Sequence, residues 1–340
     1  IASDMYAAIE NFNFILSGNL AIDYTDLDVN TWSDEVTVET GGVKYLNKTE
    51  FRFKSLLGAD LVNNKFTINE NELMLNDIVL GLEGFFNITG DSEYGVDLSY
   101  FAKETSFKSL LSMVPAMYRT GVEGLETSGS LSLDGTAKGK ITDEVMPKVN
   151  LNLLVKDGFF SYPDLPKDAS DIQIDLKVFY DGIFADNSKV DLDRFHIELG
   201  GNPVDMNFHV ITPVSDMQMT GAITGSIDLA SLADVIPMED TELGGSVNMN
   251  IELMGRLSDI ENENYEAFKA DGLLEITNVK AEGTGLPVPV NITKTSMVFS
   301  PRYVDLKTFD ANLGNSDIQM SGKLENFLPY VFKDETLRGE

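Results

Sequence analysis

The sequence predicts an all-β fold with a few short helices: a long, twisted antiparallel sheet of repeated modules that curls into an open groove. Two observations carry this prediction. Apolar and polar residues alternate along most of the chain, and one ten-residue motif recurs. Alternation with a period of two is typical of strands that have one buried face and one face in water, as in antiparallel sheets.

The alternating runs mark the expected strands, and glycine-containing turns separate several of them. About 20 strands spaced by about 4.8 Å would form a sheet on the order of 100 Å long. The alternating runs lie at residues 12–16, 20–24, 131–133, 149–155, 172–178, 204–210, 247–253 and 318–320. The expected turns are Asp157-Gly158, Asp181-Gly182, Gly200-Gly201-Asn202-Pro203 and Asp271-Gly272.

The recurring motif reads Asp-Leu-Asp-Arg-Phe-His-Ile-Glu-Leu-Gly at residues 191–200 and Asp-Leu-Lys-Thr-Phe-Asp-Ala-Asn-Leu-Gly at residues 305–314. Residues 75–84 form a looser copy. Residues 129–134 and 245–250 keep nearly the same offset, and residues 18–23 begin a weaker first copy. Such a repeat indicates stacked modules of similar structure.

The repeat predicts how the chain is divided. Residues 1–17 are the expected remnant of a helix or strand, and residues 18–106 form the first β-repeat. Residues 107–228 and 229–323 each combine a short helix with a further β-repeat. Residues 324–340 are expected to begin a truncated repeat, so we expect the chain to be a fragment of a longer protein.

Helical spacing of apolar residues occurs only in three short segments, at residues 107–114, 229–236 and 324–331. Ser106 and Asp228 are suited to cap the first two helices, and Pro115 and Pro237 are suited to end them. Helices this few and short cannot cover a long sheet. The apolar face must therefore close as stacked β-sandwich-like modules, which is the alternative fold, or line an open groove.

The composition excludes several classes of function. The 55 acidic and 25 basic residues give a net charge of −30, which argues against binding nucleic acid. The chain has no cysteine, so disulfides, thiolate metal sites and cysteine nucleophiles are excluded. No apolar stretch is long enough to span a membrane.

Sites for catalysis or metal binding are weakly supported. His196 and His209 are the only histidines, and no nucleophile motif accompanies them. Asp26, Asp28 and Asn30 have calcium-loop spacing but lack the glycine and glutamate of that motif. We therefore expect no enzyme activity, no catalytic residue, no metal site and no cofactor.

The apolar face is the most informative feature for function. Its chemistry suits lipid acyl chains, because each methylene group that it shields from water contributes about 0.8 kcal/mol. We expect the lining of the groove to include the apolar residues of several alternating runs. They are Leu131, Leu133, Leu151, Leu153, Ile174, Leu176, Met206, Phe208, Val247, Met249 and Ile251.

Three segments, with their order and spacing, resemble the AsmA-like proteins of Gram-negative bacteria in the form found in Bacteroides-type organisms. They are Gly-Gly-Val-Lys-Tyr-Leu-Asn-Lys at residues 41–48, Leu-Met-Leu-Asn-Asp-Ile-Val-Leu-Gly-Leu-Glu-Gly at 73–84, and Val-Lys-Asp-Gly-Phe-Phe-Ser-Tyr-Pro-Asp-Leu-Pro at 155–166. A fourth resembling feature is a short helix that ends in proline before a glycine-led strand.

The resemblance implies a periplasmic protein that an N-terminal helix, absent from this sequence, anchors in the inner membrane. It also implies kinship with repeating β-groove proteins that move phospholipid between the inner and outer membranes in envelope biogenesis. Phospholipid acyl chains, and other envelope proteins, would be the partners. Two alternatives stay open: a non-catalytic structural or adhesion scaffold with closed cores, and a hydrolase of envelope glycans.

Overall fold

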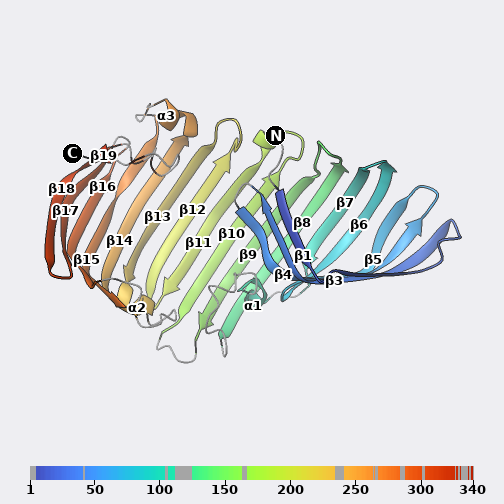
Figure 1. Cartoon of the computed structure of the whole chain (residues 1–340), viewed down its shortest axis with the longest axis horizontal. Helices are drawn as coiled ribbons and strands as arrows, with labels where there is room; N and C mark the ends of the chain where they lie inside the picture. Colours follow the sequence, from blue (N-terminus) through green and yellow to red (C-terminus); the bar gives the residue numbers. More distant parts are fainter. Residues whose placement is uncertain are drawn as a thin grey trace. The chain divides into compact units, whose positions relative to one another are not determined.

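The computed structural model of the chain is all-β, with one open antiparallel sheet of 19 strands and a few short helices (Figure 1). The structure describes residues 5–40, 43–103, 106–111, 125–162, 167–233, 241–262, 264, 267–283, 288–300, 303–325, 327, 330, 336 and 338–339. The prediction of an all-β fold with a long antiparallel sheet and about 20 strands is confirmed. The alternative of sandwich-like modules is wrong, because the described strands belong to a single sheet that does not close.

Each strand from β3 onward pairs with the next strand in the chain, as in a meander. In the first half the strands are β1 (Met5–Glu10), β2 (Asn13–Ser17), β3 (Tyr24–Thr40), β4 (Val43–Asp60), β5 (Lys65–Leu75), β6 (Ile78–Gly90), β7 (Glu93–Ala102), β8 (Glu126–Ile141) and β9 (Lys148–Ser161). In the second half they are β10 (Ala169–Tyr180), β11 (Lys189–Leu199), β12 (Asn202–Ile211), β13 (Gln218–Asp228), β14 (Thr241–Arg256), β15 (Lys269–Gly283), β16 (Val290–Phe299), β17 (Tyr303–Leu313), β18 (Ser316–Glu325) and β19 (Arg338–Gly339).

The chain forms two compact units. Unit 1 contains residues 1–120, 128–155 and 178–184, and unit 2 contains residues 121–127, 156–177 and 185–340. Each unit has a buried cluster of its own. In unit 1 the cluster consists of Leu27, Val29, Leu57, Ala59 and Ile68. In unit 2 it consists of Met219, Ile260, Phe268, Ala270, Val304 and Phe327. The predicted division into repeats follows other boundaries and stays a prediction.

The N-terminal edge of the sheet differs from the predicted pattern. β1 and β2 both pair with β3 in one continuous register, since Glu10 lies opposite Glu35 and Asn13 lies opposite Trp32. The predicted remnant of a helix or strand at residues 1–17 is therefore, in its described residues 5–17, an edge strand in two pieces. The strand predicted at residues 20–24 is wrong in its first part. Residues 18–23 form the turn before β3, where Leu20 and Ile22 are exposed.

The two close copies of the motif adopt the same local structure. They form β11 and β17, and each has a β-bulge at the same place, between Leu192 and Phe195 and between Leu306 and Phe309. Each copy ends at a glycine with a φ of +58°, in the tight turn to the next strand. The looser copy at residues 75–84 is not equivalent, because it begins at the last residue of β5, spans the turn to β6 and ends in mid-strand.

Two of the predicted turns lie within strands. Asp157-Gly158 lies in β9 and Asp271-Gly272 lies in β15. An Asp-Gly pair is typical of turns. Here Asp157 has a positive φ of +51° inside a continuous strand. The turn at Gly200-Gly201 is confirmed, since Leu199 pairs with Asn202 across it.

The first two predicted helices are confirmed in shortened form, as α1 (Phe107–Leu111) and α2 (Leu229–Ala233). Their predicted caps are present. The Ser106 hydroxyl accepts a hydrogen bond from the amide of Lys108, and Asp228 accepts one from the amide of Ala230. Pro115 and Pro237 lie outside the described residues.

The third predicted helix is only partly confirmed. Phe327 and Tyr330 are helical, but Leu324 belongs to β18. Two short elements, α3 (Leu257–Glu261) and the single 3-10 turn η2 (Ala185–Asn187), were not predicted from the sequence.

Candidate functional site

The strands of unit 2 place apolar side chains on one face of the sheet. Residues directly opposite each other in paired strands point to the same face. The register of the paired strands therefore connects Phe195, Met206, Ile223 and Ile251 on one face, and this face continues from β11 to β18. We call this surface the apolar face. Its large members are Val190, Leu192, Phe195, Ile197, Leu199, Val204, Met206, Phe208, Val210, Met219, Ile223, Ile227, Val247, Met249, Ile251, Leu253, Leu274, Ile276, Val279, Val290, Ile292, Met297, Phe299, Val304, Leu306, Phe309, Leu313, Ile318, Met320 and Leu324.

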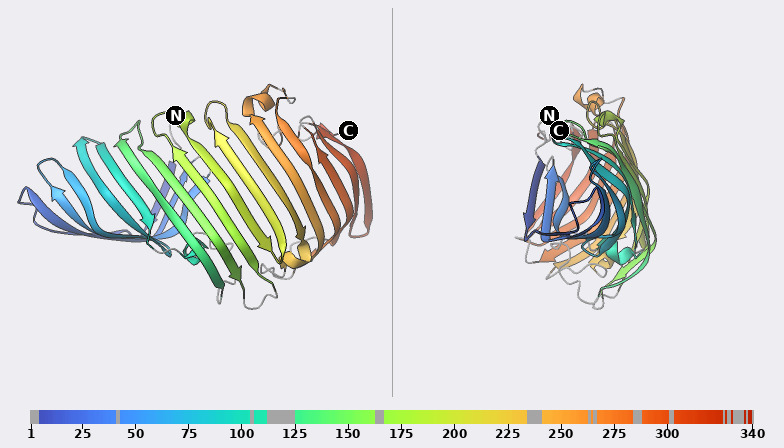
Figure 2. Two further views of the ribbon diagram at one scale, coloured as in Figure 1. Left: turned by 180° about the vertical axis from the view of Figure 1, so that it is seen from behind. Right: turned by 90° about the vertical axis from the view of Figure 1, so that its right-hand side faces the viewer.

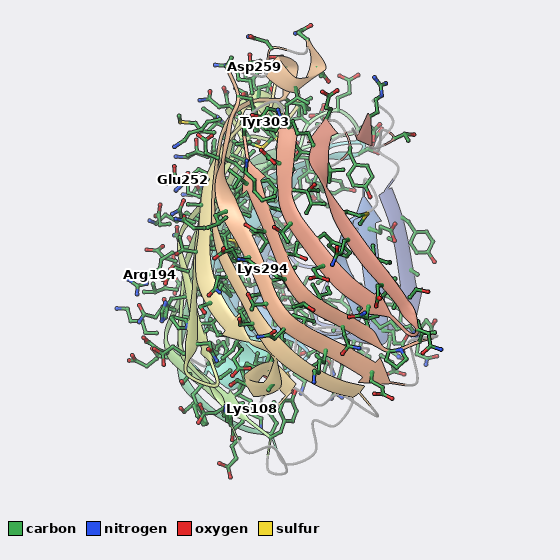
Figure 3. All side chains as sticks on the ribbon, turned by 90° about the vertical axis from the view of Figure 1, so that its left-hand side faces the viewer. Lys108, Arg194, Glu252, Asp259, Lys294 and Tyr303 are labelled. Atoms are coloured by element: carbon green, nitrogen blue, oxygen red, sulfur yellow. The ribbon has the colours of Figure 1, made fainter. Side chains whose placement is uncertain are left out.

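No charged residue shares these register positions in the described part of β11 to β18. The charges alternate onto the opposite face, which we call the polar face. Arg194 and Glu252 lie on that same outer side of the ribbon in Figure 3. On this face the Lys269 ammonium pairs with Glu252, and His196 lies opposite Asp205. In the described part of β11 to β18 the charged residues are thus confined to the polar face.

Among the residues that the structure describes, no second layer covers most of the apolar face. Its residues are mainly half-buried, and Met320 is 50 % exposed. In a closed core, large aliphatic side chains of this kind would be almost fully buried. Within unit 2, α2 and α3 lie at the ends of strands and not over the face of the sheet (Figures 1 and 2). The face therefore remains an apolar surface in contact with solvent.

One margin of the apolar face is closed. The buried cluster of unit 2 lies where β14 and β16 end and β15 and β17 begin. There Ile260 of α3 is 1 % exposed, and the rings of Phe299 and Phe327 meet edge to face with centroids 5.8 Å apart. At the opposite margin Leu313 is 37 % exposed, whereas Ala311 and Val279 are buried, so the exposure of the face is uneven there.

Five of the predicted lining residues lie together on the apolar face. Met206 faces Ile223, and Ile223 faces Ile251 on the next strand. Phe208 faces Gly221, and Met249 and Val247 continue along β14 on the same side. All five predicted residues are half-buried.

The polar residues that alternate with Ile174 and Leu176 show to which side of the sheet these two side chains point. The Lys177 ammonium donates a hydrogen bond to Asp193 at 2.6 Å and lies 3.5 Å from Asp175. The hydrogen bond from Lys177 joins β10 and β11 on their polar side and lowers the pKa of Asp193. Because side chains alternate along a strand, Ile174 and Leu176 point to the apolar side of β10.

The other four predicted residues belong to unit 1. The amide of Asn150 donates to the hydroxyl of Thr136, and Asn152 donates to Asp134, so the even-numbered residues of β8 and β9 share the polar side. The predicted lining residues have odd numbers and point to the other side. They are Leu131, Leu133, Leu151 and Leu153. Leu131 is only 1 % exposed, whereas the other three are half-buried.

The weaker candidates from the sequence occupy the polar side of strands. Asp26, Asp28 and Asn30 alternate along β3 opposite Gly58, Leu56 and Lys54, so they do not form a loop that could surround calcium. His209 lies 3.2 Å from Asp191. His196 is 9 % exposed and has three carboxylates around it, which the sequence analysis missed because Asp171 comes from a different strand.

No helix in the described residues is long and apolar enough to cross a bilayer. Comparison of the chain with protein-family models, with curated proteins and with solved structures finds no match. The resemblance to the AsmA-like family therefore stays a prediction from the sequence.

Proposed function

We propose that the apolar face binds lipid acyl chains, and that the sheet curls around them as an open groove. The observation that carries the proposal is an uncovered apolar surface, without any charged residue, that continues in register over eight strands of unit 2. Such a surface is costly in water unless it has an occupant. An acyl chain fits because it needs neither hydrogen bonds nor charges from the protein.

The geometry also suits the polar part of a lipid. The buried cluster seals the margin where β14 and β16 end, so an acyl chain would lie along the strands with its tail against this cluster and the headgroup toward the other strand ends. Leu, Ile, Val and Met offer contacts without fixed direction, which allows a chain to slide from one strand to the next. We propose that the chain thereby helps phospholipid to move between the inner and outer membranes. The periplasmic location, the membrane anchor and the absence of enzyme activity rest on the family resemblance.

Adding one negative charge to either face of strand β14 tests this function. Met249→Asp places a carboxylate in the middle of the apolar face, and Asn250→Asp adds the same charge to the next residue, on the polar face. Native mass spectrometry with organic extraction would measure bound phospholipid. We expect wild type and Asn250→Asp to retain lipid. We expect Met249→Asp to lose it at least about tenfold, because burying a carboxylate against acyl chains costs well over 1.4 kcal/mol.

The same variants distinguish the scaffold alternative. If the face is an open lipid surface, Met249→Asp keeps the β-sheet circular dichroism of the wild type, because water can reach the carboxylate once the lipid has left. Unfolding of Met249→Asp, together with a lipid-free wild-type protein that takes up no added phospholipid, would mean that the face is a closed core. The protein would then be a structural scaffold.

A further inference from the structure

We propose that unit 2 holds a site for a divalent transition-metal cation of the zinc type on its polar face, formed by Asp171, His196 and Glu198. The three side chains come from the start of β10 and from β11. Their ligand atoms all lie within 4.8 Å of one another. The site is separate from the apolar face, and its existence does not depend on lipid binding.

The imidazole of His196 is held in the orientation that metal binding needs. Its Nδ1 lies 2.7 Å from Oδ1 of Asp205, the residue directly opposite on β12. An Nδ1–H that donates to this carboxylate leaves Nε2 as the free lone pair. Nε2 lies 3.3 Å from Oδ2 of Asp171. Two ligands on a tetrahedral ion with bonds of about 2.0–2.1 Å stand about 3.4 Å apart, so these atoms already have the right spacing.

The outer contacts match those of a metal centre. Histidine ligands usually donate their second ring nitrogen to a carboxylate, and carboxylate ligands are themselves hydrogen-bonded. Asp205 supplies the first contact. The side-chain amide of Gln173 supplies the second, by donating to Oδ1 of Asp171 at 2.6 Å and leaving Oδ2 for the ion.

Among the described residues, the carboxylates around His196 differ from those around His209 in having no lysine paired with them. Near His209, Asp191 pairs with Lys189 and Asp193 pairs with Lys177. In the described part of the chain, no lysine or arginine pairs with Asp171, Glu198 or Asp205. Three carboxylates around one nearly buried imidazole repel one another, and a dication would neutralise them.

The second motif copy shows that the fold does not require these residues. The positions of His196, Glu198 and Asp205 correspond to Asp310, Asn312 and Gln319, and Asp310 lies opposite Gln319 as His196 lies opposite Asp205. The same bulged strand and turn therefore form with a different set of side chains. The ligand set of one nitrogen and two carboxylate oxygens favours zinc over magnesium or calcium, which prefer oxygen alone. A water molecule would complete four-coordination.

Titration of zinc chloride into protein that has been stripped with a chelator, followed by isothermal calorimetry, tests the site. We expect one equivalent to bind to wild type. His196→Gln and Glu198→Gln should each weaken binding by at least about tenfold, and Asp205→Asn should weaken it about 10–100-fold by releasing the imidazole. His209→Gln is the matched control, because it removes the only other histidine, and it should leave the affinity unchanged.

Nitrogen-15 spectra of the two imidazoles provide a readout independent of the variants. Zinc should shift the Nε2 resonance of His196 and leave the resonances of His209 in place. The proposal is overturned if wild type binds no stoichiometric zinc, if His196→Gln binds as tightly as wild type, or if both histidines shift equally. Circular dichroism of each variant confirms that the fold is retained, and Glu198→Gln tests the site even where a His196 variant fails to fold.

Discussion

At the scale of single residues, Gly84 shows how a position inside a strand can demand glycine. It lies in the middle of β6 opposite Ile68 and Leu98, with a φ of +119°. This conformation is strained for any residue with a Cβ, and a Cβ at Gly84 would overlap the backbone carbonyl of Asp97. Gly90, in the same strand, has ordinary van der Waals space around its Cα and no positive φ.

We therefore expect Gly84→Ala to destabilise unit 1 and Gly90→Ala to be tolerated. The strained backbone alone should reduce the free energy of unfolding by about 1–3 kcal/mol, and the overlap with Asp97 should add to this. Gly90→Ala should change it by less than about 0.5 kcal/mol. Urea unfolding followed by the fluorescence of Trp32, the single tryptophan, measures both, since Trp32 lies in unit 1. Equal midpoints for the two variants would contradict the strained conformation at Gly84.

At the scale of elements, α3 is a five-residue helix that tertiary contacts hold in place. Helices this short are not stable by themselves. Ile260 anchors α3 in the buried cluster of unit 2. Asp216, in the loop between β12 and β13, accepts hydrogen bonds from the amide and hydroxyl of Ser258, both at 3.0 Å. Asp216 also pairs with Arg256 at 3.2 Å.

These contacts predict a pH-dependent tether. The hydrogen bonds from Ser258, and then the contact with Arg256, lower the pKa of Asp216 below its ordinary value. A carboxyl whose pKa is lower in the folded state contributes stability above its unfolded pKa, of about 3.9, and loses it as the pH falls through the folded value. We expect the Ser258 amide resonance to stay constant above about pH 4 and to titrate below it. Asp216→Asn should abolish most of this titration, whereas a midpoint at the ordinary aspartate value would show that the tether is absent.

The alternation of apolar and polar residues predicted the strands well, because one side of the sheet is apolar and the other is in water. This pattern is visible in residues that are neighbours in the sequence. The alternation placed Met206, Met249 and Ile251 on one face. The capping residues at the starts of α1 and α2 were also predicted from the sequence. The helix α3 was missed because its stability comes from Ile260 and Asp216, which are not visible as a periodic pattern. Whether a second layer covers Met249, and which strand brings Asp171 to His196, depends on contacts distant in sequence.

At the scale of the whole molecule, the chain contains two compact units, each with its own buried cluster. In the meander, each strand from β3 onward pairs with the next strand in the chain, so most contacts between elements join consecutive strands. Proteins in which each element contacts only its neighbours behave as chains of linked folding units rather than as one cooperative core. Leu57 in unit 1 and Phe268 in unit 2 are the most useful probes, since they belong to different clusters and are 7 % and 0 % exposed.

Truncating either side chain should therefore weaken one unit and spare the other. Phe268→Ala removes a fully buried ring and should cost unit 2 about 3–5 kcal/mol, and Leu57→Ala should cost unit 1 about 2–5 kcal/mol. Native-state hydrogen exchange can separate the two effects. We expect Phe268→Ala to lower amide protection in β13 to β17 while β3 to β6 keep wild-type rates, and Leu57→Ala to do the reverse. A uniform loss of protection in both variants would mean that the sheet unfolds as one cooperative body. The hydrogen bonds between strands would then link the unfolding of the two units.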